Sequence, residues 1–286
     1  MAELLARAHR LGLISQKRWI AMEKNRTALL PILSEQGSDD SVLIIAFSGG
    51  AQRLGVSVHE FFETTKTLGY NRILLRDPYF RHYHYGVDRA RPDWPSLIAY
   101  LRAEVDRLQP KKILCVGSSS GGYAAIVAGH HLRADFVHAF GPQTEVVSRM
   151  TGGAPATRFD RWRFSKRGIY TEALDLAPML AGYNGVSRYF IHYGTGNEKD
   201  RNAAMRITDM PGVTTLGYET DAHVIAVFLA KRKFLGQILV IENQHRLAEL
   251  ARRHFADKMR ITSDEAVTTA RKAQNADTSR SHRLTP

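Results

Sequence analysis

Six short apolar segments, separated by stretches with helical periodicity, constrain the fold of this chain more than any other feature. Each is long enough for a strand and short for a helix, and most of them are nearly continuous apolar runs. Such runs are typical of strands covered on both faces, as in parallel sheets with helices on either side. The sequence therefore predicts an α/β fold with a mostly parallel sheet of about six strands. The six segments are 41–47, 71–77, 111–117, 134–141, 187–194 and 213–219.

The organisation along the chain predicts one main domain, residues 41–236, with segments before, within and after it. Residues 1–40 carry apolar side chains at helical spacing and are expected to form a helical lead-in. The stretch 142–186 is long for a connection between two strands, so it is expected to be an inserted cap. Residues 237–286 are expected to form a basic tail that is helical or partly disordered.

The third apolar segment leads directly into GSSSG, residues 117–121, which fits the motif G-x-S-x-G with Ser119 at its centre. In that motif the serine lies on a sharp turn from a strand into a helix, and the glycines allow neighbouring backbone to approach closely. The amide groups of the following helix suit developing negative charge. The sequence thus predicts that Ser119 is a nucleophile; the alternative is a loop that only turns the chain or cradles a phosphate.

A serine nucleophile needs a base and an acid that orients the base, and both should follow it along the chain. Asp200 follows the fifth predicted strand, and His223 follows the sixth. Because the carboxyl ends of parallel strands meet at one edge of the sheet, these side chains are expected to lie near Ser119. Asp175 and Asp221 are alternatives for the acid. The other role open to Asp221 is that of a cap for the last helix.

The same chemistry requires backbone amides that stabilise an oxyanion. The residue after the nucleophile, Ser120, is expected to supply one amide, and the loop after the first strand, with Gly49 and Gly50, a second. The alternative for that loop is a phosphate-binding turn. Neither glycine loop matches G-x-G-x-x-G or is followed by a Walker lysine, so a nucleotide cofactor is not expected.

Together, FSGG, GSSSGG and the loops of Asp200 and His223 resemble the α/β-hydrolase superfamily over about residues 41–236. The resemblance implies a minimal core, because the first strands of the full eight-stranded sheet are not apparent. With LLRDPYFRHYHYG and IHYGTGNEKD, the chain is also similar to hydrolase-like proteins of bacterial polysaccharide and glycan-export systems.

The predicted activity is that of a serine hydrolase which cleaves a carboxylic ester or thioester, small or glycan-linked, through an acyl-enzyme. An acyltransferase with a sugar or other hydroxyl acceptor would use the same residues, and an inactive hydrolase-like scaffold is the third interpretation.

The segment after the second strand, RDPYFRHYHYGVD, could line a polar or anionic substrate pocket or form an ordinary surface loop. Arg76, Asp77 and, from the helix after the nucleophile, Tyr123 are the candidate pocket residues. A metal is not expected, because His82 and His84 have no further ligand at supporting spacing.

The net charge of +12 bears on partners, but residues 231–286 supply half of it with twelve Lys/Arg against six Asp/Glu. No nucleic-acid motif accompanies the charge, so a solvated tail is expected and a nucleic-acid partner is not.

No apolar run is long enough to cross a membrane, which predicts a cytoplasmic protein, with a basic N-terminal presequence as the alternative. The single cysteine, Cys115, is expected in the core. Both a monomer and a homo-oligomer are compatible with the sequence.

Overall fold

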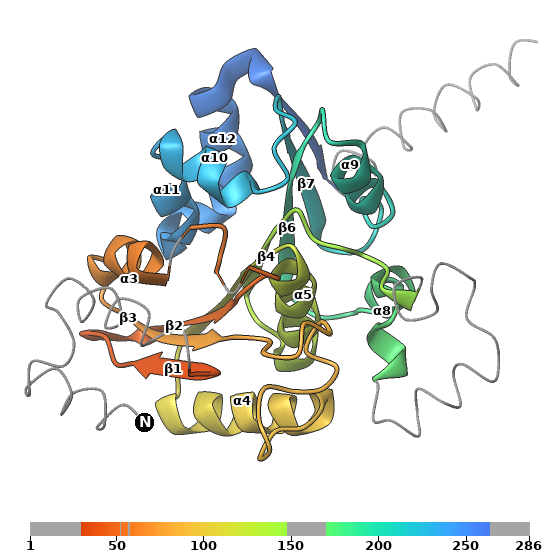
Figure 1. The fold of residues 1–286 in the computed structure, drawn as a ribbon. Coiled ribbons are helices and arrows are strands. Elements are labelled where there is room, and N and C mark those ends of the chain that lie inside the picture. The colour runs from red at the N-terminus through yellow and green to blue at the C-terminus, as the bar shows by residue number, and fades with distance from the viewer. Residues whose placement is uncertain (1–29, 52, 57, 148–169, 264–286) are drawn as a thin grey trace, which may run out of the picture.

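The computed structural model describes residues 30–51, 53–147 except 57, and 170–263, which form one eight-stranded sheet with helices on both faces (Figure 1). The strand order is β1-β3-β2-β4-β5-β6-β7-β8. The six central strands are parallel and match the six predicted segments, so the predicted fold class is confirmed. The strands are β1 (Ile32–Glu35), β2 (Asp39–Phe47), β3 (Tyr70–Leu75), β4 (Lys112–Ser118), β5 (Phe136–Phe140), β6 (Arg188–Gly194), β7 (Val213–Tyr218) and β8 (Met259–Ser263).

The two strands beyond the predicted six, β1 and β8, are antiparallel edge strands. The expectation of helix up to residue 40 is therefore wrong for 32–35, which pair along their whole length with β3. A four-residue segment directly after Pro31 has no local signal strong enough to identify it, and pairing with β3 decides its conformation. Residues 1–29 lie outside the described part of the chain.

The chain also continues to pack beyond residue 236, where the main domain was expected to end. Helix α12 (Leu247–Phe255) buries Leu247, Ala251 and Phe255, which lie four residues apart on one face. After it, β8 pairs with β7. The predicted tail is therefore part of the domain up to residue 263, and 264–286 lie outside the described residues.

The helices form two layers, one on each face of the sheet. Along β2, Leu43, Ile45 and Phe47 pack under one layer, while Ile44 and Ala46 pack under the other. Both faces of the strand are thus buried, which explains its continuous apolar run. The layer with the first set contains α4 (Trp94–Leu108), α5 (Ser120–Leu132), α8 (Leu176–Ala181) and α9 (Glu198–Met205); the other contains α3 (Val58–Lys66), α10 (Ile225–Lys231), α11 (Leu235–Leu239) and α12.

The expected cap, 142–186, is described only at its two ends, because 148–169 lie outside the described residues. Its second end contains a single turn of 3₁₀ helix, Thr171–Ala173, and the short helix α8. Leu176 and Leu180 of α8 are fully buried in the core, so this part of the segment is integral to the domain.

Candidate active site

Ser119 lies on the turn between β4 and α5, at the carboxyl edge of the parallel strands. Its backbone has φ 55° and ψ −118°, which few residues other than glycine adopt. Strain of this kind costs about 1–3 kcal/mol and persists only where the surroundings enforce it. Here the Ser119 amide donates to the carbonyl of Phe140 at 2.8 Å, which ties the turn to the end of β5.

The glycines around Ser119 are required by close backbone contacts. A Cβ atom on Gly121 would lie 2.1 Å from the carbonyl oxygen of Phe47, and one on Gly117 would lie 2.0 Å from that of Gly121. Both distances are far below van der Waals contact, so no side chain fits at either position. The steric reason inferred from the motif therefore applies in this structure.

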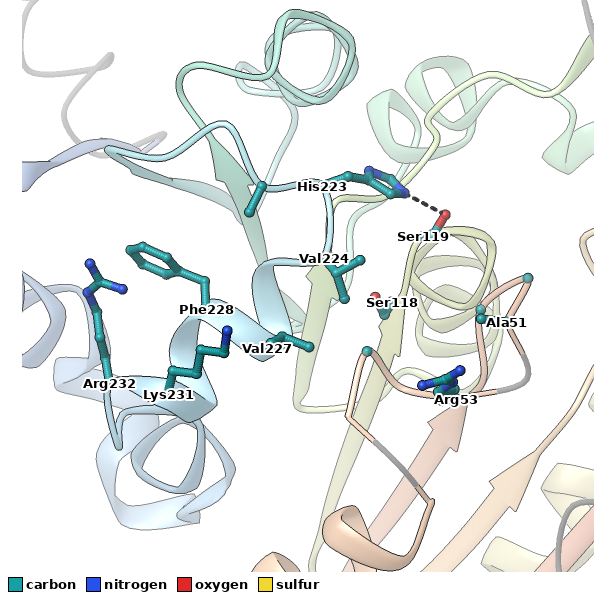
Figure 2. A pocket seen from close by; sticks show the side chains of 14 residues that line it. Ala51, Arg53, Ser118, Ser119, His223, Val224, Val227, Phe228, Lys231 and Arg232 are labelled. Carbon is teal, nitrogen blue, oxygen red and sulfur yellow. Dashed lines mark hydrogen bonds between the residues drawn. The ribbon is translucent and has the colours of Figure 1, made fainter. Parts of the chain in front are cut away.

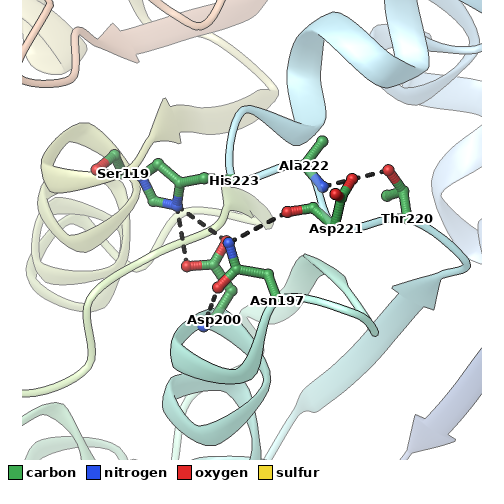
Figure 3. Close-up of polar contacts among 7 residues, drawn as sticks. All are labelled: Ser119, Asn197, Asp200, Thr220, Asp221, Ala222 and His223. Carbon is green, nitrogen blue, oxygen red and sulfur yellow. Dashed lines mark hydrogen bonds and ion pairs between the residues drawn. The ribbon is translucent and has the colours of Figure 1, made fainter.

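His223 forms hydrogen bonds with both Ser119 and Asp200. Its Nε2 lies 3.1 Å from the Oγ of Ser119 (Figure 2), and its Nδ1 lies 2.9 Å from each carboxylate oxygen of Asp200 (Figure 3). Because the carboxylate accepts a hydrogen bond from Nδ1–H, Nε2 is left to accept the Ser119 hydroxyl proton. The structure thus brings together the three side chains that the sequence singled out.

Burial differs along this chain of hydrogen bonds. The Asp200 side chain is 7% exposed, whereas that of His223 is 44% exposed. The carboxylate is therefore shielded from water, while the imidazole and the hydroxyl are open to a ligand. This arrangement can hold one tautomer of the imidazole and move a proton at Nε2.

Asn197 links the first turn of α9, which carries Asp200, to the loop that carries His223 (Figure 3). Its side-chain oxygen accepts from the Asp200 amide at 3.1 Å and caps α9, and its Nδ2 donates to the Asp221 carbonyl at 3.3 Å. The alternative acids occupy other places. Asp175 caps α8 and pairs with Arg206, and Asp221 contributes its backbone carbonyl to the link with Asn197.

The expected oxyanion donors differ in availability. Ser120 opens α5, so its amide has no acceptor within the helix. Gly50 has no hydrogen-bond partner for its amide among the described residues and borders the space around Ser119. The Gly49 amide, in contrast, donates to the Arg53 carbonyl at 2.8 Å, because the loop folds back on itself. Gly49 is therefore not a free donor, contrary to the expectation.

The three residues expected in a substrate pocket are buried and line neither cavity beside Ser119. Arg76 donates to the Leu30 carbonyl at 2.8 Å, and burial lowers the pKa of its guanidinium. The Asp77 carboxylate accepts from three amides of its own loop, at 2.7–3.1 Å, and so folds that loop. The Tyr123 hydroxyl donates to the Ala173 carbonyl at 2.8 Å.

Two cavities, of about 780 and about 740 Å³, lie on either side of the Ser119–His223 pair, and both are bordered by Gly50. Sequence reasoning missed the first, because the helix that forms its wall, α10, looks like any amphipathic helix. Apart from glycine, alanine, serine and His223, the residues that line this first cavity are Arg53, Val224, Val227, Phe228, Lys231 and Arg232 (Figure 2). The second cavity contains Phe80, His82, Gln143, Glu145, Asn197 and Lys199.

Two further features bear on the kind of site. Within the described residues, no three His, Cys, Asp or Glu side chains are grouped so that they could hold a metal ion. In the same part of the chain, every helix is too short or too polar to span a bilayer.

No protein-family model matches this sequence, and no curated protein is similar to it in sequence. Solved structures with a similar fold include the capsule O-acetyltransferase of Neisseria meningitidis serogroup A, at 14% identity and a TM-score of 0.48, with 72% of this chain and 90% of that one covered. MenH from S. aureus has 13% identity and a TM-score of 0.49, with 75% and 98% covered. Mouse alpha/beta hydrolase domain-containing protein 10 has 14% identity and a TM-score of 0.49, with 78% and 96% covered.

The architecture itself, a mostly parallel sheet flanked by helices, is the fold class that the sequence predicts. At these identities the likeness does not extend to a reaction or a substrate.

Proposed function

We propose that this protein is a serine hydrolase that cleaves a carboxylic ester or thioester through an acyl-enzyme, with Ser119 as nucleophile, His223 as base and Asp200 as the residue that orients His223. The observation that carries the proposal is the continuous chain of hydrogen bonds from the Ser119 hydroxyl through the imidazole to the buried Asp200 carboxylate. A serine hydroxyl is a weak nucleophile by itself, and an adjacent oriented base is what activates it.

In the first half of the reaction, the Ser119 Oγ attacks the carbonyl carbon of the substrate while its proton passes to Nε2 of His223. The tetrahedral intermediate collapses when the bond to the leaving group breaks, and the imidazolium returns the proton to the leaving alcohol or thiol. The acyl group then remains on Ser119. Asp200 stabilises the imidazolium and keeps Nδ1 protonated throughout.

In the second half, a water molecule takes the place of the leaving group. His223 accepts a proton from the water as its oxygen attacks the acyl carbon, and it returns a proton to Ser119 when the carboxylic acid leaves. The oxyanion of both intermediates is assigned to the amides of Ser120 and Gly50, one at the start of α5 and one in the loop after β2.

Labelling with a fluorophosphonate probe tests the proposal. Wild-type protein should be labelled and Ser119→Ala should not, whereas Ser120→Ala should keep the label because that position is assigned a role only through its backbone. His223→Ala should slow labelling by several orders of magnitude. A wild-type protein that is inert both to the probe and to simple esters would refute the proposal and favour a hydrolase-like scaffold.

A second activity, acyl transfer, is supported by the two cavities that meet at Ser119. A hydrolase needs room for one substrate and a water molecule, whereas a transferase needs places for a donor and a hydroxyl acceptor. Incubation of an acyl donor with methyl glycosides, followed by mass spectrometry of the products, would distinguish them. Acylated glycoside would indicate transfer, and free acid alone would indicate hydrolysis.

A further inference from the structure

One face of α10 forms a wall of the cavity that contains Arg53. Val224, Val227, Phe228 and Lys231 all border this cavity, at spacings of three and four residues. The helix begins at Ile225, two residues after His223, so this wall leads away from the proposed reaction centre (Figure 2). A ligand whose carbonyl lies at Ser119 can therefore extend along α10.

The near part of the wall is apolar and accessible. Val224 is 40% exposed, and Val227 and Phe228 are partly exposed beside it. Apolar side chains that line a cavity favour an apolar stretch of ligand, which removes their surface from water.

The rest of the cavity is positively charged. Arg53 lies on the loop after β2, and Lys231 and Arg232 lie at the end of α10 (Figure 2). In the part of the chain that the structure describes, no acidic residue lines the cavity, and none of the three cations has an ion-pair partner. The Arg232 guanidinium lies 3.9 Å from the centre of the Phe228 ring, which holds it at the wall.

The cavity on the other side of Ser119 has a different character. Lys199 there shares the space with Glu145 and Asp200, so its charges are mixed. The positive charge near Ser119 is therefore concentrated on the α10 side, and the overall charge of the chain does not account for this asymmetry.

Building on the proposed function, we propose that the α10 cavity selects an acyl substrate with an anionic group, a phosphate or a carboxylate, joined to the reacting carbonyl by an uncharged stretch of chain. Val224 and Lys231 are seven residues apart, so the rise of the helix places Lys231 about 10 Å farther along α10 than Val224, which follows His223. The phosphate of a thioester leaving group or the terminal carboxylate of an acyl chain would satisfy this chemistry equally.

Two matched pairs of substrates separate these sources. S-acetylpantetheine and acetyl-CoA share the thioester, and only acetyl-CoA carries phosphates on the leaving group. The p-nitrophenyl ester of octanoate and the mono-p-nitrophenyl ester of suberate share the chain length, and only the second carries a terminal carboxylate. For the wild type we expect kcat/KM to favour the charged member of at least one pair by about ten-fold, the size of two exposed ion pairs acting together.

The double variant Lys231→Gln/Arg232→Gln should bring that ratio close to one. Lys66→Gln is the matched control, because Lys66 is exposed at the end of α3 and lines neither cavity beside Ser119. The wild-type preference should also weaken with added salt. A preference in the thioester pair alone assigns the anion to the leaving group, and one in the ester pair alone assigns it to the acyl group.

Turnover of both pairs without any charge preference would overturn this inference and leave the proposed function standing. Absence of turnover, with wild type and Ser119→Ala indistinguishable, would count against the proposed function. In that case, anion selection is tested by binding alone: the shift in Tm caused by CoA is compared with the shift caused by pantetheine. Binding of CoA alone, lost in the double variant and kept in Lys66→Gln, supports the cavity as an anion site, and equal shifts in both variants refute it.

Discussion

Gly141→Ala tests how tightly the fold holds the proposed reaction centre. Gly141 follows β5 in the left-handed conformation, with φ +54°, and its amide donates to the His192 carbonyl at 2.7 Å. An added Cβ would lie 2.9 Å from the His223 carbonyl oxygen, 3.2 Å from an Asp200 carboxylate oxygen and 3.5 Å from the Nδ1 of His223. One methyl group would thus press on both the base and the acid.

The cost has two parts. The left-handed conformation disfavours any residue with a Cβ by about 1–2 kcal/mol, and overpacking of a tight site adds about 1–3 kcal/mol. We therefore expect the free energy of unfolding to fall by about 2–5 kcal/mol, the sum of the two parts. Since a misplacement of about 1 Å can cost a factor of about 100 in rate, a smaller shift of His223 should lower kcat about ten- to a hundred-fold with little change in KM.

Urea denaturation and ester hydrolysis measure the two effects, and two glycines serve as controls. Gly182 has φ −83° and open space where a Cβ would go, so Gly182→Ala should change neither quantity. Gly212 has φ +71°, and a Cβ there would lie 2.5 Å from the Ser187 carbonyl oxygen, so Gly212→Ala should lose stability and keep the wild-type kcat. A Gly141→Ala protein that is destabilised but turns over like the wild type would refute the reasoning.

Three other predictions follow from buried polar groups. Asp200→Asn should lower kcat by about 10⁴, because an amide can donate to Nδ1 and favours the wrong tautomer of His223; equal rates for the variant and the wild type would contradict it. Tyr123→Phe should cost about 1–3 kcal/mol in urea denaturation without changing KM, because it leaves the Ala173 carbonyl and His84 unsatisfied; a raised KM with unchanged stability would return Tyr123 to a substrate pocket. Burial lowers the pKa of His138 to about 4, below its ordinary value of 6.5, so below pH 6.5 the unfolded chain binds a proton that the folded chain does not. This residue should therefore lower the free energy of unfolding by about 1.4 kcal/mol for each pH unit as the pH falls from about 6 to 4. Urea midpoints that depend on pH equally in His138→Gln and in the wild type would contradict this prediction.

The sequence predicts the centre of the fold well because local pattern and tertiary environment agree there. A strand buried on both faces, such as β2 or β4, must be apolar along its length, so it is visible without its neighbours. The turn at Ser119 is visible for a similar reason, because the contacts of Gly117 and Gly121 admit only glycine. In each case the structure admits only one class of residue: apolar residues in the strands and glycine in the turn.

The edges of the sheet are less predictable, since a short strand there depends on one partner. Ile32–Glu35 becomes a strand by pairing with β3, and Met259–Ser263 by pairing with β7. The predicted substrate-pocket residues differ from the observed cavity lining for another reason. Arg76 and Asp77 are polar side chains near the active edge, but their partners are backbone groups of Leu30 and of their own loop. Polarity in the sequence does not tell whether a side chain serves a ligand or the backbone.

The identity of the acid next to His223 illustrates what decides between equivalent residues. Three aspartates lie within reach of the relevant strand ends, and composition does not rank them. The choice follows from helix capping: Asn197 caps α9 by accepting from the Asp200 amide, which places Asp200 in the first turn with its carboxylate toward His223. The same asparagine donates to the loop that carries His223. A residue with no part in proton transfer therefore fixes the relative position of two that are proposed to have one.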